Sequence, residues 1–225
     1  MASRNISLTP RAENTRDARP VSTPIQFSLT EIKHHFTESM DEVRSQFAVA
    51  DELNTNGNKT ACKMVWRSQV VLAEGLLDFY IHEISKYCMM RMFSGSWPKT
   101  DKYKIFQIPM EKVENAIAAM ESNDWFFEYL NNRFSRDVFL SCESMRDQLN
   151  LIGITFSRVM MKAFPSENEQ ESIRLGKEII TELFQRRNKI AHQNDRSHAS
   201  AEQTDISKEF VEDYISKVEA IVNAI

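Results

Sequence analysis

The sequence predicts an all-α protein, and three observations support that prediction. Apolar residues recur at three- and four-residue steps in several segments, which is the spacing of one face of an α-helix. No segment shows the apolar-polar alternation bounded by turns that marks a strand. The 225 residues include only 5 Gly and 6 Pro, which is little of the turn punctuation that sheets need.

The first predicted helix has a complete start signal. Ser28 is suited to the N-cap, and Glu31 stands where a capping box requires an acid or amide. The helix ends in the Asn- and Gly-containing segment 54–58. Its apolar stripe consists of Ile32, Phe36, Met40, Val43 and Phe47.

The middle of the sequence predicts a long buried helix followed by shorter ones. Segment 60–93 has no Pro and carries apolar residues on more than one face, and it stops at the breaker cluster 94–98. Pro109 is well placed as the first residue of a helix reaching about 121, because its missing N–H costs nothing there. The aromatic segment 124–133 is either a short helix or a packed irregular segment.

The last third of the sequence predicts three more helices. Segment 141–151 is followed by Gly153, a plausible C-terminal stop. Ser166 and Glu169 form a second capping box, which opens an amphipathic helix that runs to about 192. A polar loop separates it from the closing helix 206–225.

The chain is expected to divide into three parts. Residues 1–26 hold few large apolar side chains and predict a flexible arm. Residues 27–59 form the N-terminal helix and a linker, and residues 60–225 form the main helical domain.

Composition narrows the functional classes. The net charge of −4 is a poor match to proteins that coat nucleic acid by bulk electrostatics, so any RNA contact must be local. No apolar run approaches the roughly 18 residues that span a bilayer, so no membrane contact is expected. The three cysteines show neither disulfide nor zinc-ligand spacing, and a reducing, cytoplasmic location is expected.

Segment 185–196 gathers the residues that could carry chemistry. It holds four Arg or Lys and one His on an otherwise acidic chain, which makes it a local phosphate-attracting patch. On a helix Asn188 and His192 share a face, whereas Arg187 is offset by roughly 140° from His192. A neighbouring helix or subunit is therefore expected to help complete a site.

These residue types suit RNA cleavage through attack by the 2′-hydroxyl. His192 can transfer protons near neutral pH, and Arg187 can hold phosphate oxygens with its planar fork. That scheme requires no metal or cofactor, and none is predicted. A second interpretation stays open on spacing alone, because Arg, Lys and His are favoured in the last turn of any helix, at the negative end of its dipole.

The run RRNKIAH at 186–192 resembles the R-x4-6-H signature of HEPN ribonucleases, including the polar residue after the Arg. It also stands where that superfamily keeps it, at the end of a late helix before a polar loop. The run VVLAEGLLDFYI at 70–81 is similar to the apolar early helix with an embedded acid. The run SMRDQLNLIGI at 144–154 and the aromatic cluster at Trp125 are similar to the subgroup called RiboL-PSP-HEPN. The resemblance covers 60–225.

The resemblance implies a HEPN-type helical bundle that forms a homodimer, so that two motifs build one cleft. It implies metal-free RNA cleavage that leaves a 2′,3′-cyclic phosphate, often in toxins or antiviral defence, with an antitoxin or regulatory protein as a possible partner. Arg187 would contact the scissile phosphate, His192 would be the acid-base group or position the 2′-hydroxyl, and Asn188 would orient His192 or the phosphate. A Tyr follows the His in toxins modified by nucleotidyltransferase antitoxins, but Gln193 stands here, so control by that route is not expected.

Further residues are expected around this site. Arg186 and Lys189 are expected to face solvent or RNA phosphate, and Arg196 to contact RNA or, with Asp195, to order the loop after His192. Three residues of the central helix could support Arg187 and His192, namely Glu74, Asp78 and His82. In the other interpretation, the two acids are exposed and His82 is a core residue. The alternative function is a non-catalytic HEPN module that binds RNA or scaffolds a protein partner.

Overall fold

The computed structural model describes residues 25–119 and 124–225. All the named secondary-structure elements in those ranges are helices. The predicted all-α class is therefore confirmed. The arm predicted at 1–26 lies outside the described residues except for its last two positions. The helices are α1 (Leu29–Thr55), α2 (Lys59–Phe93), α3 (Asp101–Lys104), α4 (Met110–Ala119), α5 (Asp124–Phe134), α6 (Cys142–Leu151), α7 (Phe156–Ala163), α8 (Glu169–Gln193) and α9 (Lys208–Ala224).

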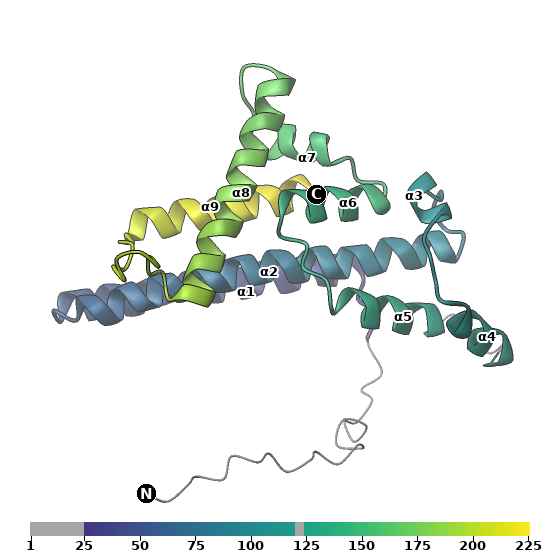
Figure 1. The fold of residues 1–225 in the computed structure, drawn as a ribbon, viewed down its shortest axis with the longest axis horizontal. Helices are drawn as coiled ribbons and strands as arrows, with labels where there is room; N and C mark the ends of the chain where they lie inside the picture. The colour runs from purple at the N-terminus through teal and green to yellow at the C-terminus, as the bar shows by residue number, and fades with distance from the viewer. Residues whose placement is uncertain (1–24, 120–123) are drawn as a thin grey trace, which may run out of the picture.

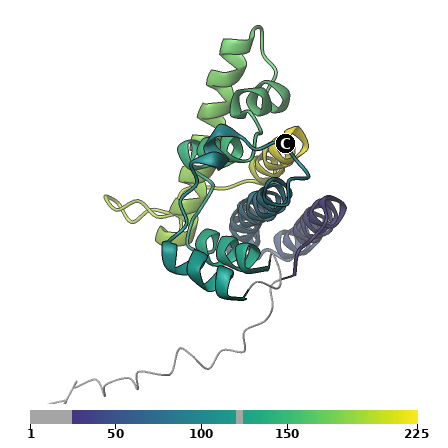
Figure 2. The same cartoon turned by 90° about the vertical axis from the view of Figure 1, so that its right-hand side faces the viewer.

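Helix α2 is the centre of the molecule. It packs against α1, α9, α8, α5 and α6. Helices α1 and α2 form a long antiparallel hairpin, α9 runs beside α2, and α8 crosses them steeply (Figure 1). Figure 2 shows α1, α2 and α9 nearly end-on as three neighbouring rods. Since α2 has neighbours on several sides, its apolar residues surround the helix instead of forming one stripe.

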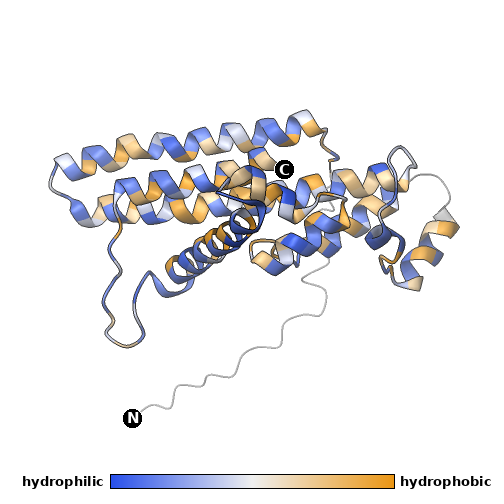
Figure 3. Cartoon of the chain, turned by 90° about the horizontal axis from the view of Figure 1, so that it is seen from above, coloured by the Kyte–Doolittle hydropathy of each residue, from blue (hydrophilic) through white to orange (hydrophobic). Residues whose placement is uncertain are grey.

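The first helix begins as the sequence predicts. The Ser28 hydroxyl accepts a hydrogen bond from the backbone N–H of Glu31, and the Glu31 carboxylate accepts one from the N–H of Ser28 at 2.7 Å. Its stripe is buried against α2 at Ile32, Phe36, Met40 and Val43. Figure 3 shows hydrophobic and hydrophilic residues intermixed along both long helices.

The start of α8 differs from the prediction. Asn168, and not Ser166, is the N-cap, and its side chain accepts a hydrogen bond from the N–H of Glu171. Ser166 instead donates its N–H to the hydroxyl of Ser172 at 2.9 Å. Asn and Ser are equally good N-caps, so composition did not separate the two positions.

Two short helices, α3 and α7, were not predicted, and the aromatic segment at 124–133 is helical. Helix α7 has only eight residues, and it is held by packing on α8 and α9. Within the described residues, no helix has both the length and the apolar character needed to cross a membrane.

Candidate functional site

The Arg-to-His motif lies at the C-terminal end of α8, as expected. The helix ends after Gln193, where Asn194 and Asp195 both adopt the left-handed conformation, with φ of 49° and 60°. Asn and Asp tolerate this conformation better than most residues. The N–H of Asp195 donates to the carbonyl of Lys189 at 3.0 Å, which turns the chain back under the last turn.

That turn places Asp195 in a fully buried position between two arginines. Arg186 donates two hydrogen bonds to its carboxylate, at 2.6 and 2.8 Å, and Arg67 of α2 donates one at 3.0 Å. Arg67 also donates to the carbonyl of Thr204, at the far end of the loop. The cluster therefore fixes the loop after α8 to both α8 and α2.

Arg186 was expected to face solvent or RNA phosphate, but it does not extend into solvent. Its side chain is 15% exposed, and its guanidinium is held by Asp195. Burial lowers the pKa of Arg186, and the charge of Asp195 opposes that effect. Since an Arg stays protonated in proteins, Arg186 keeps its positive charge at ordinary pH.

Arg187 differs from Arg186 and Arg67 in making no ion pair within the described residues, although the Glu74 carboxyl lies near enough for its charge to interact with the guanidinium. The Arg187 Nη1 donates to the Asn188 side-chain oxygen at 3.0 Å, and its buried Nε has no hydrogen-bond partner within the described part of the chain. The motif spacing of four to six residues before His192 fits both Arg186 and Arg187. The two differ in that only Arg186 forms an ion pair within the described residues.

Asn188 connects the two faces of α8 on which Arg187 and His192 lie. It stands four residues before His192, hence on the same face, while its side chain accepts the hydrogen bond from Arg187. His192 is exposed and makes no hydrogen bond or ion pair within the residues that the structure describes. The imidazole is therefore accessible to solvent.

Glu74 of α2 lies beneath this end of α8 and is 1% exposed, which excludes the interpretation as an exposed acid. Tyr214 Oη lies 3.0 Å from a Glu74 carboxyl oxygen and 2.9 Å from the Leu183 carbonyl oxygen. A phenol has one proton, so both contacts are hydrogen bonds together only when Glu74 is protonated and donates. Burial raises the pKa of Glu74 to about 7, against the lowering effects of Tyr214 and Arg187.

Asp78 and His82 follow Glu74 along α2, but other contacts occupy them. Asp78 accepts a hydrogen bond from the N–H of Phe139 at 2.8 Å and lies 3.6 Å from His82. The His82 ring packs on Phe139 at 4.5 Å between centroids and on Phe134 at 6.4 Å. His82 therefore matches the core interpretation, and neither side chain contacts Arg187 or His192.

The remaining basic residues belong to the loop after α8. Lys189 donates to the Thr204 hydroxyl at 2.6 Å, and Arg196 donates to the Ala201 carbonyl at 2.7 Å. An isolated bridge pairs Arg196 with Gln203. The expectation that Asp195 and Arg196 order this loop is confirmed, while RNA contacts of Lys189 and Arg196 stay predictions.

The sequence interpretation missed Arg67 and Tyr214. Both lie on helices far from the motif in sequence, and neither belongs to a local pattern that marks function. The consecutive Asn194 and Asp195 were a usable signal for the end of α8, because Asn is common at a left-handed helix terminus. Asn194 and Asp195 do not reveal from the sequence that Arg67 is the partner of Asp195.

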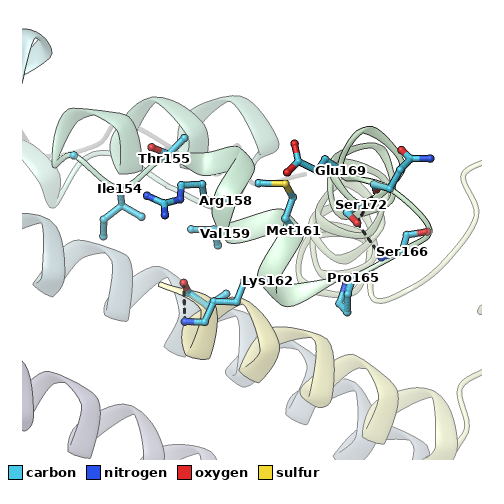
Figure 4. A pocket seen from close by; sticks show the side chains of 13 residues that line it. Ile154, Thr155, Arg158, Val159, Met161, Lys162, Pro165, Ser166, Glu169 and Ser172 are labelled. Carbon is cyan, nitrogen blue, oxygen red and sulfur yellow. Dashed lines mark hydrogen bonds between the residues drawn. The ribbon is translucent and has the colours of Figure 1, made fainter.

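A cavity of about 800 Å³ lies elsewhere, between α7 and the first turn of α8 (Figure 4). It is lined by polar and charged residues that include Arg158, Lys162, Glu169 and Ser172. Ser172 is 15 residues before Arg187, which is about 22 Å along a helix. The motif does not contribute to this cavity.

No group of three His, Cys, Asp or Glu side chains in the two described ranges could hold a metal ion. None of the three cysteines, which all lie in the described ranges, forms a disulfide, and Cys62 and Cys88 are buried. Burial raises the pKa of Cys88 to about 12, so that thiol is not a nucleophile near neutral pH.

An all-α bundle with an Arg-Asn pair and an exposed His at the end of a late helix has the form of a HEPN domain. The family model described as RiboL-PSP-HEPN matches residues 29–225. The chain therefore belongs to the RiboL-PSP-HEPN family, and the match includes α1, which the resemblance in sequence did not cover. Comparisons with curated proteins and with solved structures found no match.

Proposed function

We propose that this protein is a metal-independent endoribonuclease. The observation that supports the proposal best is the different state of the two adjacent arginines. Arg186 is ion-paired with buried Asp195, whereas Arg187 makes no ion pair within the described residues and donates a hydrogen bond to the Asn188 side chain. A helix that needed cations only for its dipole has no reason to hold one arginine in this way.

In the proposed reaction His192 accepts the proton of a ribose 2′-hydroxyl, and the 2′-oxygen forms a bond to phosphorus. The bond from phosphorus to the 5′-oxygen breaks, and that oxygen takes a proton from an imidazolium. The products are a 2′,3′-cyclic phosphate and a 5′-hydroxyl. Arg187 stabilises the charge that develops on the phosphate oxygens, and Asn188 positions its guanidinium.

The two proton transfers suggest that two copies of the chain act together. One motif supplies one His192 and one Arg187, while a pair of facing motifs supplies a base and an acid at once. The exposed position of His192 leaves it available to such a site. We therefore propose a homodimer, which sedimentation analysis at micromolar concentration tests. Full activity in a strict monomer contradicts this arrangement.

The main experiment measures cleavage of total RNA and transfer RNA in EDTA. We expect wild type to cleave, and Arg187→Ala and His192→Ala to lose activity by at least about 100-fold. His198→Ala and Arg158→Ala are matched controls, because both residues are exposed and lie outside the motif. Circular dichroism establishes that each variant is folded.

The outcomes separate the candidate functions. Activity that disappears in EDTA, or that survives both motif substitutions, contradicts the proposal. RNA binding without cleavage supports the non-catalytic HEPN module instead. A toxin or antiviral role requires that wild type arrest growth or phage replication in cells and that His192→Ala fail to do so. Co-purification of one specific cellular protein with this chain would identify an antitoxin or regulatory partner.

A further inference from the structure

A second hollow, of about 340 Å³, lies between α8 and α9 beside the motif. We call it the α8–α9 hollow; its lining includes Glu182, Gln185, Arg186 and Lys189 of α8 and Phe210 and Lys217 of α9. Its volume is at the lower end of the roughly 300–1,000 Å³ of small-ligand sites. Two of its residues, Arg186 and Lys189, also belong to the motif.

The hollow presents an aromatic ring next to a guanidinium. Phe210 is 38% exposed, and the Arg186 guanidinium carbon lies 5.4 Å from the centre of its ring. Because Asp195 holds Arg186 with two hydrogen bonds, this guanidinium is fixed before any ligand arrives. Unpaired bases stack on surfaces of this kind, on aromatic rings and on Arg planes.

Polar groups without partners stand beside that surface. Neither Glu182 nor Gln185 makes a hydrogen bond to another part of the described chain. A carboxylate can only accept hydrogen bonds, whereas an amide both donates and accepts. Together they match the edge of a base that carries an exocyclic amino group, which uracil lacks.

The position of the hollow relative to His192 fits a bound RNA strand. Gln185, Lys189 and His192 are separated by four and three residues, so they follow one face of α8. Gln185 and His192 are about 10 Å apart along the helix axis, with Lys189 between them. The Lys189 ammonium donates one hydrogen bond to Thr204 and keeps two further donors, which can bind a phosphate between the base and the reactive bond.

We infer that the α8–α9 hollow binds one unpaired, amino-bearing nucleobase of an RNA strand, next to the phosphate that reaches His192. The inference rests on the proposed function for the direction of the strand. Base binding itself is a separate property of the hollow. It would make this end of the molecule select single-stranded RNA by the identity of a neighbouring base.

The test measures binding of fluorescent 2′-O-methyl tetranucleotides of A, C, G or U by anisotropy. Their blocked 2′-hydroxyl prevents the proposed cleavage, so binding is read separately. We expect wild type to bind at least one amino-bearing sequence more tightly than the U sequence, and Phe210→Ala to weaken that binding about tenfold. Glu182→Gln should reduce the preference over U. Trp97→Ala is the control, since Trp97 has the same 38% exposure and lies outside the hollow.

The readings distinguish failure of the subsite from failure of the nuclease. Equal or tighter binding of U by wild type, absence of binding, or unchanged binding in both hollow variants overturns the subsite. This holds even if Arg187 and His192 prove essential for cleavage. Binding that depends on Phe210 and Glu182 without any cleavage retains the subsite and rejects the nuclease. If Phe210→Ala does not fold, the exposed Glu182→Gln alone decides the question.

Discussion

Asp195 and Arg186, nine residues apart, are joined by two hydrogen bonds across the end of α8, and the carboxylate is fully buried. The same carboxylate accepts a third hydrogen bond from Arg67 of α2. One acid therefore connects the end of the motif helix, the loop after it and the central helix. Of the two motif arginines, only Arg186 takes part in this pairing.

Asp195→Asn should strongly destabilise the fold. The substitution leaves buried Arg67 and partly buried Arg186 without a counter-charge, and breaking a buried pair in this way costs about 3 to 5 kcal/mol. Urea unfolding followed by circular dichroism measures the change. Asp51→Asn is the matched control, because Asp51 pairs with Lys208 at the surface, and its loss should cost less than about 1 kcal/mol. Equal effects of the two substitutions contradict the role assigned to Asp195.

The protonation of Glu74 should make stability depend on pH. Its pKa is raised by burial from 4.5 to about 7, so the folded protein binds this proton more tightly than the unfolded chain does. The resulting stability is fully present below about pH 4.5 and is lost as pH rises through about 7.

Relative to Glu74→Gln, the wild-type free energy of unfolding should fall by roughly 2 to 3 kcal/mol between pH 5 and pH 8. The comparison isolates Glu74, because every other titrating group is common to both proteins. Denaturant unfolding at a series of pH values gives the difference. A constant difference across that range means that Glu74 does not hold the proton.

Local patterns in the sequence predicted more of this molecule than distant contacts did. The capping box at Ser28 and Glu31 and the end of the motif helix near His192 follow from residues within a few positions of one another. Asp195 also binds Arg67 of α2, which lies 128 residues away, and no local pattern encodes a contact of that separation. Helix α7 escaped prediction for a related reason, since its eight residues depend on packing against α8 and α9.

Substitution of the two motif arginines by lysine should separate catalysis from stability. Arg187→Lys keeps the charge but loses the planar fork, so cleavage should fall about 100-fold while stability changes by less than about 1 kcal/mol. Arg186→Lys loses its two-point contact with Asp195, so the main effect should be on stability. Single-turnover cleavage and urea unfolding of each folded variant measure the two quantities. A larger catalytic loss in Arg186→Lys would mean that Arg186 is the arginine that contacts the phosphate.

Two helical glycines should respond in opposite ways to alanine. A Cβ at Gly176 of α8 would lie 2.6 Å from the Met160 sulfur and 2.9 Å from the Met160 Cβ of α7, so the two helices must separate. Overpacking of this kind typically costs about 1 to 3 kcal/mol. At Gly75 of α2 nothing lies within 4 Å, so Gly75→Ala should stabilise the protein by about 0.5 to 1 kcal/mol through the better helix propensity of alanine. Thermal and urea unfolding of both variants test the packing of α7 on α8. Stabilisation by Gly176→Ala would show that this contact is looser than the structure places it.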